Sequence, residues 1–271
     1  MDAFYALLLG VVQGFTEFLP ISSSAHLLLA REILDWEGSG ALGLSFDVAC
    51  HVGTLLSVLV YFRSDVTRLV QVSLRPSAWG DRLRPESVLF RAICWGTVPT
   101  IVIGVAAGEF VSGSLRTTAV VAVTLVLGAI AMLVVERIGK QDRDETTLTV
   151  WEALAIGCGQ ALALVPGVSR SGAILIIGLF LGLRRRSAAR FAFLLGIPAI
   201  VAAGAKTALD LWVTPDPRVD PLLFAIGIAS SAIVGYVVVK YFIAYVSRYS
   251  LDVFAAYRFV LGTSVAIWFV S

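Results

Sequence analysis

The chain has 271 residues, of which 58% are hydrophobic and only 15% are charged, and its mean hydropathy is +0.88. Because a soluble domain averages roughly 25% charged residues, this composition excludes an ordinary soluble domain and predicts an integral membrane protein. The net charge is +2, and the arginines gather in loops between apolar runs, which indicates membrane orientation rather than a nucleic-acid partner.

Two apolar stretches, 1–34 and 149–183, are interrupted by LPISSS around Pro20 and by VPGVSRSG around Pro166. Proline ends a helix, and the residue before it prefers extended backbone. Each half is then shorter than the roughly 20 residues that a spanning helix needs. We therefore predict an all-α polytopic membrane protein with two re-entrant helical hairpins. Six uninterrupted stretches are predicted to be transmembrane helices: 44–62, 88–108, 117–137, 190–212, 221–246 and 252–270.

Basic residues distinguish the two sides of the membrane. The connections 35–43 and 109–116 are poor in Lys and Arg and are predicted outside. The hairpin 149–183 lies between two basic connections, so it enters and leaves on the inner side. The hairpin 1–34 then enters from outside, and both chain ends are predicted on the outer side of the cell membrane. Three connections rich in Lys or Arg are predicted inside: 63–91, 137–143 and 184–190.

Hairpins that enter from opposite sides are typical of an inverted-topology repeat. GVVQGFTEFLPISSS at 10–24 and GCGQALALVPGVSRS at 157–171 share a Gly-x-x-Gln start, an apolar stretch, a Pro and a Ser pair, with a one-residue gap before the Pro. We predict a single membrane domain with 1–137 as the first repeat and 149–271 as the second. The two interrupted tips are expected to meet near the middle of the bilayer.

The first tip carries polar groups that are unusual at membrane depth. Serine is a favoured N-cap, and a helix N-terminus binds anions such as phosphate. Ser23 and His26 are three residues apart, so both are expected to face the same cavity, and Gln13 and Glu17 share a helix face because they are four apart. The residues of interest are Gln13, Glu17, Ser22, Ser23, Ser24 and His26.

The second tip repeats the arrangement with an arginine. PGVSRSG turns at Gly167 and restarts a helix near Ser169, followed by Arg170 and Ser171. The planar guanidinium is always charged and matches phosphate oxygens in bidentate fashion. Two helix N-termini, an arginine and several serines together predict a site for a multiply charged oxyanion, either phosphate or pyrophosphate.

Structural roles are the alternative for several of these residues. Ser24 and Ser171 could bond to a carbonyl one turn earlier, and Ser22 and Ser169 could serve only as caps. Ionisable residues at membrane depth have functional roles by default, which favours function for the Glu, His and Arg of the tips. Asp47 and His51 are interpreted as a mutually satisfied structural pair. Lys206, Tyr257 and Arg258 are left undecided, with a structural role favoured.

The residues leave the chemistry open. Ser23 could attack phosphorus with His26 or Glu17 taking its proton, His26 could attack, or one of them could orient a water molecule. Glu17 could also hold a divalent cation that bridges the phosphates. The rival function is a transporter or flippase for an anionic lipid phosphate or a small anion, because broken helices in inverted repeats are also typical of transporters. The Ser-x-x-His spacing favours the enzyme, and we expect its site to open outward.

Both tips closely resemble the motifs of undecaprenyl-diphosphate phosphatases, membrane enzymes linked to bacitracin resistance. Their (E/Q)xxxE segment reads QGFTE at 13–17, and their PGxSRSxxT segment reads PGVSRSGAI at 166–174. EFLPISSSAH and AAYRF, at 255–259, also look like the family, and the similarity covers essentially the whole length. Two positions depart from the common pattern, since Gln13 stands where many members have Glu and Ile174 replaces the Thr. An inactive relative is a third reading on this ground.

The resemblance implies removal of the terminal phosphate from undecaprenyl diphosphate, which recycles the lipid carrier of peptidoglycan synthesis. It further implies a divalent cation, Mg²⁺ or Ca²⁺, at Glu17, contact with membrane lipids, and a homodimer as one form of assembly. It casts Glu17, Ser23, His26 and Arg170 as catalytic. Substrate contacts are expected from Gln13, Ser22, Ser24, Gly167, Ser169 and Ser171.

Overall fold

The computed structural model describes residues 2–33, 43–81, 83–216 and 219–270, and within these ranges the chain is helical. A short 3-10 turn, η2 (Glu145–Thr147), and a backbone bridge between Arg143 and Leu183 lie in the connections. The helices are α1 (Asp2–Thr16), α2 (Ser23–Ile33), α3 (Leu44–Tyr61), α4 (Arg63–Ser73), α5 (Pro76–Trp79), α6 (Pro85–Ser114), α7 (Thr118–Ile138), α8 (Val150–Leu162), α9 (Arg170–Phe180), α10 (Arg185–Val213), α11 (Pro221–Val246) and α12 (Asp252–Val270).

Five helices within the described residues are long and apolar enough to cross a membrane, so the chain is a polytopic membrane protein. They are α3, α6 up to Ala107, α7, α10 and α11, and they coincide with five of the six predicted spans. The sixth predicted span, 252–270, forms helix α12 but is not among these five. The predicted connection 109–116 is helical for most of its length, because α6 continues to Ser114 before Thr117 caps α7, although the span within α6 ends at Ala107. The predicted connection 35–43 lies, apart from Gly43, outside the described residues.

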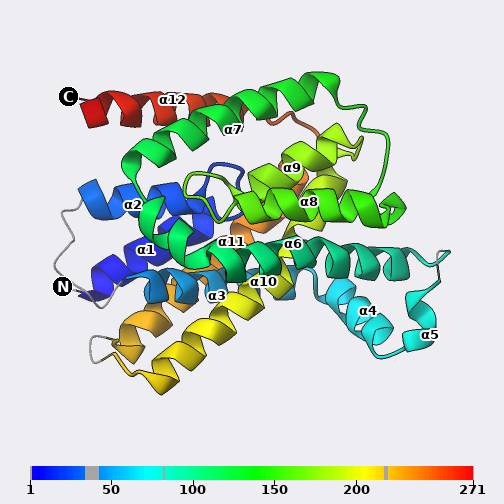
Figure 1. The fold of residues 1–271 in the computed structure, drawn as a ribbon, viewed down its shortest axis with the longest axis horizontal. Coiled ribbons are helices and arrows are strands. Elements are labelled where there is room, and N and C mark those ends of the chain that lie inside the picture. The colour runs from blue at the N-terminus through cyan, green and yellow to red at the C-terminus, as the bar shows by residue number, and fades with distance from the viewer. Residues whose placement is uncertain (1, 34–42, 82, 217–218, 271) are drawn as a thin grey trace.

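Two pairs of short helices interrupt the series of long ones. Helices α1 and α2 have 15 and 11 residues, and α8 and α9 have 13 and 11. At 1.5 Å per residue the longest extends about 22 Å, which is less than the roughly 30 Å hydrocarbon core of a bilayer. In Figure 1, α1 and α2 have their outer ends where the chain begins and ends, whereas α8 and α9 return toward the opposite end of the molecule, the end that also carries α4 and α5.

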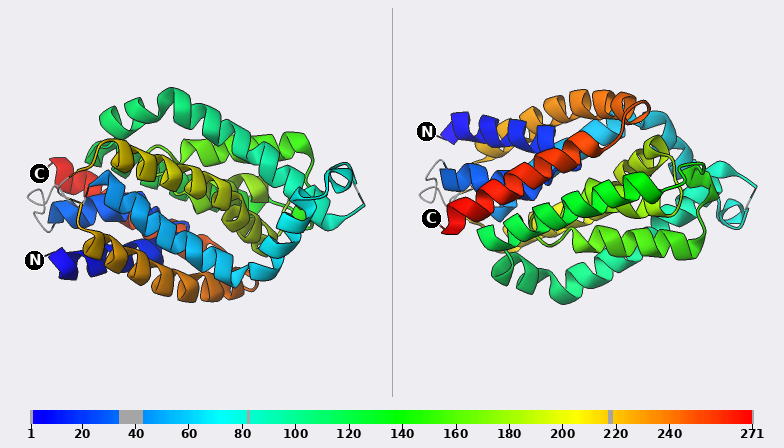
Figure 2. Two further views of the ribbon diagram at one scale, coloured as in Figure 1. Left: turned by 90° about the horizontal axis from the view of Figure 1, so that it is seen from below. Right: turned by 90° about the horizontal axis from the view of Figure 1, so that it is seen from above.

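Several of the main helix contacts join one half of the chain to the other. Helix α1 packs on α11 and α8 packs on α6, so each half supplies the partner for the other half's interrupted helix. The pairs α3 with α10 and α7 with α12 also join the two halves. Both views of Figure 2 show these helices lying side by side along the long axis of the molecule.

Small residues allow the interrupted helices to approach their partners closely. A Cβ added to Gly14 of α1 would lie 2.8 Å from the Ser231 carbonyl oxygen of α11. A Cβ added to Gly157 of α8 would lie 2.2 Å from the Gly96 carbonyl oxygen of α6. Helices in membranes associate through such close contacts of small residues, and here the contacts fix where each tip ends.

Arginines at the end that carries α4 and α5 are tied to carboxylates. Arg184 donates to Asp144, Arg185 to Glu136, and Arg190 to both Asp65 and Glu145. Ser187 Oγ also donates to Asp144 Oδ1, at 2.9 Å. The hydrogen bonds from Ser187 and Arg184 hold the pKa of Asp144 below its ordinary value. These contacts connect the start of α10 to α4, to the end of α7 and to the connection between α7 and α8.

Candidate active site

The first tip is a strained turn between α1 and α2. Ser22 lies in the left-handed region at φ 73°, which a residue with a side chain rarely adopts. Its Oγ accepts from the Ala25 amide at 3.4 Å and lies 3.1 Å from Ser24 Oγ. Ser22 therefore caps α2, as the sequence allowed, and it is only 1% exposed.

The second tip uses the same device. Ser169 is the N-cap of α9, and its Oγ accepts from the Gly172 amide at 3.1 Å. Its Oγ also lies 3.0 Å from Ser171 Oγ. Gly167 turns the chain at φ 86°, where a Cβ would lie 1.9 Å from Thr124 Oγ1. In both tips, therefore, a serine caps the following helix and its hydroxyl lies beside that of the serine two residues later.

Hydrogen bonds join the two tips directly. Ser171 Oγ donates to the Leu19 carbonyl oxygen at 3.1 Å, and the Gly167 amide donates to Ser24 Oγ at 3.4 Å. Both serines thus bridge the tips, where the sequence had left open a bond to their own helix. The predicted meeting of the tips is present in the structure.

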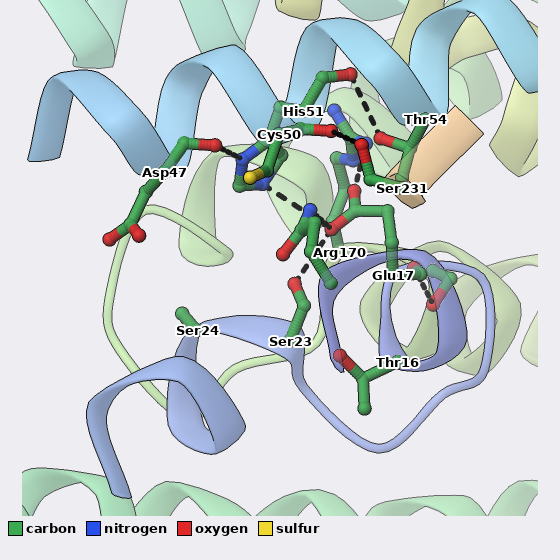
Figure 3. A network of polar contacts seen from close by, with 12 residues as sticks. Thr16, Glu17, Ser23, Ser24, Asp47, Cys50, His51, Thr54, Arg170 and Ser231 are labelled. Carbon is green, nitrogen blue, oxygen red and sulfur yellow. Dashed lines mark hydrogen bonds and ion pairs between the residues drawn. The ribbon is translucent and has the colours of Figure 1, made fainter. Parts of the chain in front are cut away.

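Glu17 is the polar centre between the tips. Its Oε2 accepts from Ser23 Oγ at 2.6 Å and from Gln13 Nε2 at 2.8 Å, and its Oε1 accepts from Arg170 Nη2. His51 Nε2 lies 3.3 Å from the same Oε2. Figure 3 shows Ser23, His51 and Arg170 directed at Glu17 from three different segments. Because these donors surround it, a carboxylate that is only 6% exposed is paired rather than isolated.

Ser23 and Arg170 hold equivalent places. Each lies between the two serines of its tip, and each bonds to Glu17. The first tip therefore presents a hydroxyl and the second a guanidinium to the same carboxylate. The cavity beside Glu17 and Arg170 has a volume of about 10 Å³, which is room for about one water molecule. A diphosphate would have to separate the ion pair in order to enter.

The predicted Asp47–His51 pair is wrong at the level of side chains. His51 Nδ1 lies 2.8 Å from the backbone carbonyl oxygen of Asp47, while the Asp47 carboxylate accepts from Arg31 at 2.9 Å and from Arg116 at 2.8 Å. A carbonyl only accepts, so Nδ1 carries a proton. His51 Nε2 is also within ion-pair distance of Glu17 Oε2 when the imidazole is protonated. His51 is thus a site residue that the sequence assigned to structure.

His26 is bonded to Ser22 and Tyr257 rather than to Ser23 or Glu17. Its Nδ1 lies 2.7 Å from the Ser22 carbonyl oxygen, and its Nε2 lies 2.7 Å from Tyr257 Oη. The carbonyl requires a proton on Nδ1, so Nε2 accepts from the tyrosine hydroxyl in the neutral ring. His26 and Tyr257 line an apolar groove of about 470 Å³ that does not include Glu17 or Ser23. Through this hydrogen bond His26 fixes the carbonyl group of Ser22, the residue before Ser23.

Arg258 connects both tips to α7. It is only 2% exposed, and its guanidinium donates to the carbonyl oxygens of Pro20 and Gly167, each at 3.2 Å. It also donates to the carbonyl oxygens of Thr124 at 2.9 Å and Leu125 at 3.3 Å. The sequence had left its role undecided between structure and function. The sequence signal that could have marked Arg258 as important is its position as a charged residue within an apolar run.

Oxygen ligands for a divalent cation are few but present. Gln13 is fully buried, and its Oε1 has no hydrogen-bond partner, although Nε2 of the same side chain is bonded to Glu17. The described residues contain no group of three or more His, Cys, Asp or Glu side chains placed to hold a metal ion. Mg²⁺ is often held by only one or two carboxylates together with substrate phosphates. The donor set therefore fits a cation that arrives with a diphosphate.

Comparison with known proteins shows the family of the chain. Residues 6–264 match the family described as Bacitracin resistance protein BacA. The chain belongs to this family. It is 43% identical over 98% of its length to an undecaprenyl-diphosphatase of Rubrobacter xylanophilus, with 98% of that protein covered. It is 38% identical to that of Thioalkalivibrio sulfidiphilus, with 99% of this chain and all of that protein covered, and 40% identical to that of Alcanivorax borkumensis, with 99% of each covered.

The family motifs coincide with the two tips. The 13–17 segment is the last turn of α1 and the residue that follows it, and it supplies Gln13 and Glu17. The 166–174 segment forms the second tip and the start of α9. Ile174, the departure from the motif's Thr, is fully buried in the hydrophobic core around α9 and α10. Its side chain therefore fills a packing position in this chain.

Proposed function

We propose that the chain hydrolyses the terminal phosphate of undecaprenyl diphosphate, which gives the monophosphate lipid carrier and inorganic phosphate. This reaction recycles the carrier for peptidoglycan synthesis and accounts for bacitracin resistance. The observation that carries the proposal is that Glu17 accepts hydrogen bonds from both tips. The Ser23 hydroxyl donates from the first tip and the Arg170 guanidinium from the second. The family and the names of the relatives support the same substrate.

Substrate binding begins with exchange at Arg170. The terminal phosphate takes the place of the Glu17 carboxylate at the guanidinium, because a bidentate phosphate contact matches the planar fork of arginine. The N-termini of α2 and α9 add backbone amides and positive dipole ends to the same region. Glu17 keeps Ser23, Gln13 and His51 as partners after the exchange.

Ser23 is the proposed nucleophile. Its hydroxyl proton already points at Glu17 Oε2, at 2.6 Å, so Glu17 takes the proton as Ser23 Oγ attacks the terminal phosphorus. The bond from that phosphorus to the bridging oxygen breaks, and the lipid monophosphate leaves with the proton that Glu17 passes to it. Water then attacks the phosphoserine, with the regenerated Glu17 carboxylate as base, and Glu17 returns this proton to Ser23 Oγ as phosphate leaves. His26 takes no proton in this scheme, because its ring is bonded to Ser22 and Tyr257.

Glu17 and the free Oε1 of Gln13 would hold a divalent cation together with diphosphate oxygens. When bound, Mg²⁺ or Ca²⁺ neutralises charge on the transferring phosphoryl group. Phosphate release is expected to stop in EDTA and to return with added Mg²⁺ or Ca²⁺. Calorimetric titration of the cation into protein with a non-hydrolysable diphosphate gives a second readout, in which Glu17→Gln weakens cation binding.

The membrane arrangement is part of the proposal. Residues 1–137 and 149–271 form inverted repeats in the cell membrane, α12 is the sixth span, and the short helix pairs are re-entrant. The exchange of contacts between halves, the matching tips and the return of each pair to its own end support this. The chain ends lie outside, the site opens outward, and Ser22, Ser24, Gly167, Ser169 and Ser171 contact phosphate or hold its cradle. A homodimer stays a prediction.

A product assay tests the proposed reaction. Purified protein in detergent is incubated with undecaprenyl diphosphate labelled in its terminal phosphate, and the lipid and aqueous products are separated. Lipid monophosphate and labelled phosphate in equal amounts are expected, with labelled phosphoserine trapped by rapid acid quench. If folded protein leaves the diphosphate intact and instead moves it between the leaflets of vesicles, the transporter function is correct.

A further inference from the structure

A second hollow borders the first tip through Leu19 but does not include Glu17, Ser23 or Arg170. It is a groove of about 850 Å³ whose wall is α11 from Val237 to the end of the helix, together with the turn that follows it. Phe15 of α1, Tyr61 of α3 and Phe254 of α12 close its other sides. The volume is within the range of specific ligand sites. The sequence motifs and the proposed function use none of the α11 residues.

Three cations line this groove without a carboxylate. Arg186, Lys240 and Arg248 are all exposed lining residues, and the lining contains no Asp or Glu. Among the residues that the structure describes, none of the three forms an ion pair. Arg186 differs in this from its two neighbours at the start of α10, because Arg184 and Arg185 are each paired with a carboxylate. The groove therefore presents three positive charges that the protein itself does not balance.

Aromatic rings form a fixed wall beside these charges. The rings of Tyr245 and Tyr249 are 5.0 Å apart, and those of Tyr245 and Phe254 are 5.4 Å apart in an edge-to-face arrangement. Lys240 lies 5.9 Å from the centre of the Tyr241 ring. Tyrosine and lysine gather at the level of lipid head groups in membrane proteins. The groove has this character at the end of the molecule that carries the basic connections.

We propose that this groove binds an anionic phospholipid. The head-group phosphate lies among Arg186, Lys240 and Arg248, and one acyl chain lies on the apolar floor toward Phe15. Basic pockets between membrane helices hold anionic head groups in this manner. The groove does not include Glu17, Ser23 or Arg170, and the exclusion of the substrate's prenyl chain from it rests on the proposed function.

The prenyl chain of the substrate is the other candidate occupant. Its diphosphate is expected at Arg170, so only hydrocarbon would enter this groove, and hydrocarbon gives three cations nothing to bind. An anionic head group accounts for both the charges and the apolar floor. The charge of the lining therefore decides in favour of a phospholipid.

Native mass spectrometry tests the inference with dioleoyl-phosphatidylglycerol and, separately, dioleoyl-phosphatidylcholine as probes. The variant Arg186→Ala/Lys240→Ala/Arg248→Ala removes three charges from the groove. The matched control Arg63→Ala/Arg75→Ala/Lys140→Ala removes three exposed charges from the same end of the molecule outside it. Circular dichroism and thermal melting establish that both variants are folded before lipid is added.

Wild type and control are expected to retain phosphatidylglycerol over phosphatidylcholine, and the groove variant to bind phosphatidylglycerol about 100-fold more weakly. Equal retention of the two lipids by wild type would overturn the inference. So would equal losses in the groove and control variants. A third arm uses undecaprenyl monophosphate: if it depends on the three cations while phosphatidylglycerol does not, the occupant is a polyprenyl lipid and the inference is wrong.

Discussion

Glu17 is held by donors from four segments, which explains how a carboxylate is tolerated in so apolar a chain. Gln13, Ser23, His51 and Arg170 each reach one of its oxygens. Removing a partner from a buried charge costs about 3–5 kcal/mol, because it leaves the charge uncompensated. The same contacts aim the Ser23 hydroxyl and keep Arg170 in place for phosphate. Stability and chemistry therefore depend on one side chain.

Ser23→Ala removes the proposed nucleophile. Phosphate release from undecaprenyl diphosphate is expected to fall by about 10²–10⁴-fold, the usual effect of losing a directly participating group. Binding of the diphosphate is expected to change little, because Arg170 and the helix ends are untouched. Ser247→Ala is the control, since Ser247 only donates to the Ile243 carbonyl oxygen. Release at more than a tenth of the wild-type rate by Ser23→Ala would exclude Ser23 as nucleophile.

Tyr257→Phe removes the hydroxyl that donates to His26 Nε2 at 2.7 Å. One hydrogen bond is worth about 1 kcal/mol, so kcat is expected to fall about fivefold while KM stays constant. Tyr249→Phe is the control, because Tyr249 lies outside the groove shared by His26 and Tyr257. An unchanged kcat would mean that His26 is positioned without Tyr257.

Residue-level reasoning from the sequence found the tips but not all of their partners. Glu17, Ser23 and Arg170 were predictable because charges and capping residues beside a proline are rare in apolar runs. His51 was missed because a spacing of four residues pairs it equally well with Asp47, and only the packing of α3 against the first tip brings it to Glu17. The direction of His26 was missed because Tyr257 lies 231 residues away in the chain.

Each tip is held in one shape by a residue with positive φ and by a serine that caps the following helix. Ser22 and Gly167 both have positive φ, and Arg258 holds a carbonyl oxygen in each tip. The sequence predicted both breaks from their prolines, and the structure places short helices on either side. The sequence did not predict which hydrogen bonds join the tips, because the partners of Arg258 and Ser171 lie more than a hundred residues away in the chain.

Gly167→Ala tests the second tip. The left-handed backbone and a Cβ 1.9 Å from Thr124 Oγ1 make any side chain unfavourable at this position. The free energy of unfolding is expected to fall by about 1–3 kcal/mol, and phosphate release with it. Gly80→Ala is the control, because its Cβ would meet nothing within 4 Å. Equal melting temperatures for the two variants would contradict the assigned strain.

The connection before α10 gives a pH-dependent prediction. The pKa of Asp144 is lowered by Ser187 and Arg184, so its stabilising effect is present above the unfolded pKa, about 3.9, and is lost as pH falls through the folded value. Ser187→Ala is expected to lower Tm at pH 6, and the difference from wild type is expected to shrink toward pH 3. A difference that stays constant between these pH values would show that Asp144 does not contribute through its charge.

At the scale of the whole molecule, two halves of one chain interlock to build one site. Each half's interrupted helix packs on a long helix of the other half, and one tip supplies Ser23 while the other supplies Arg170. Hydropathy predicted five of the spans because length and apolar composition are local properties. The interlocking was beyond the sequence, because it depends on close contacts such as Gly14 with α11 and Gly157 with α6.

The orientation in the membrane is tested by labelling. In a cysteine-free background, Thr214→Cys and Ser77→Cys place exposed thiols at opposite ends of the molecule. A membrane-impermeant reagent applied to intact cells is expected to label position 214 and not position 77, because the basic connections are predicted inside. The reverse pattern would invert the topology and the face to which the site opens.

The most direct test of a shared site is to disable one tip at a time. Phosphate release from undecaprenyl diphosphate is measured for Ser23→Ala, Arg170→Ala and the double variant, with Arg137→Ala as the control for loss of an exposed arginine. We predict that each single variant loses nearly all activity, that the double variant is no worse than the singles, and that Arg137→Ala retains full activity. Full activity in Arg170→Ala would contradict a site built from both tips.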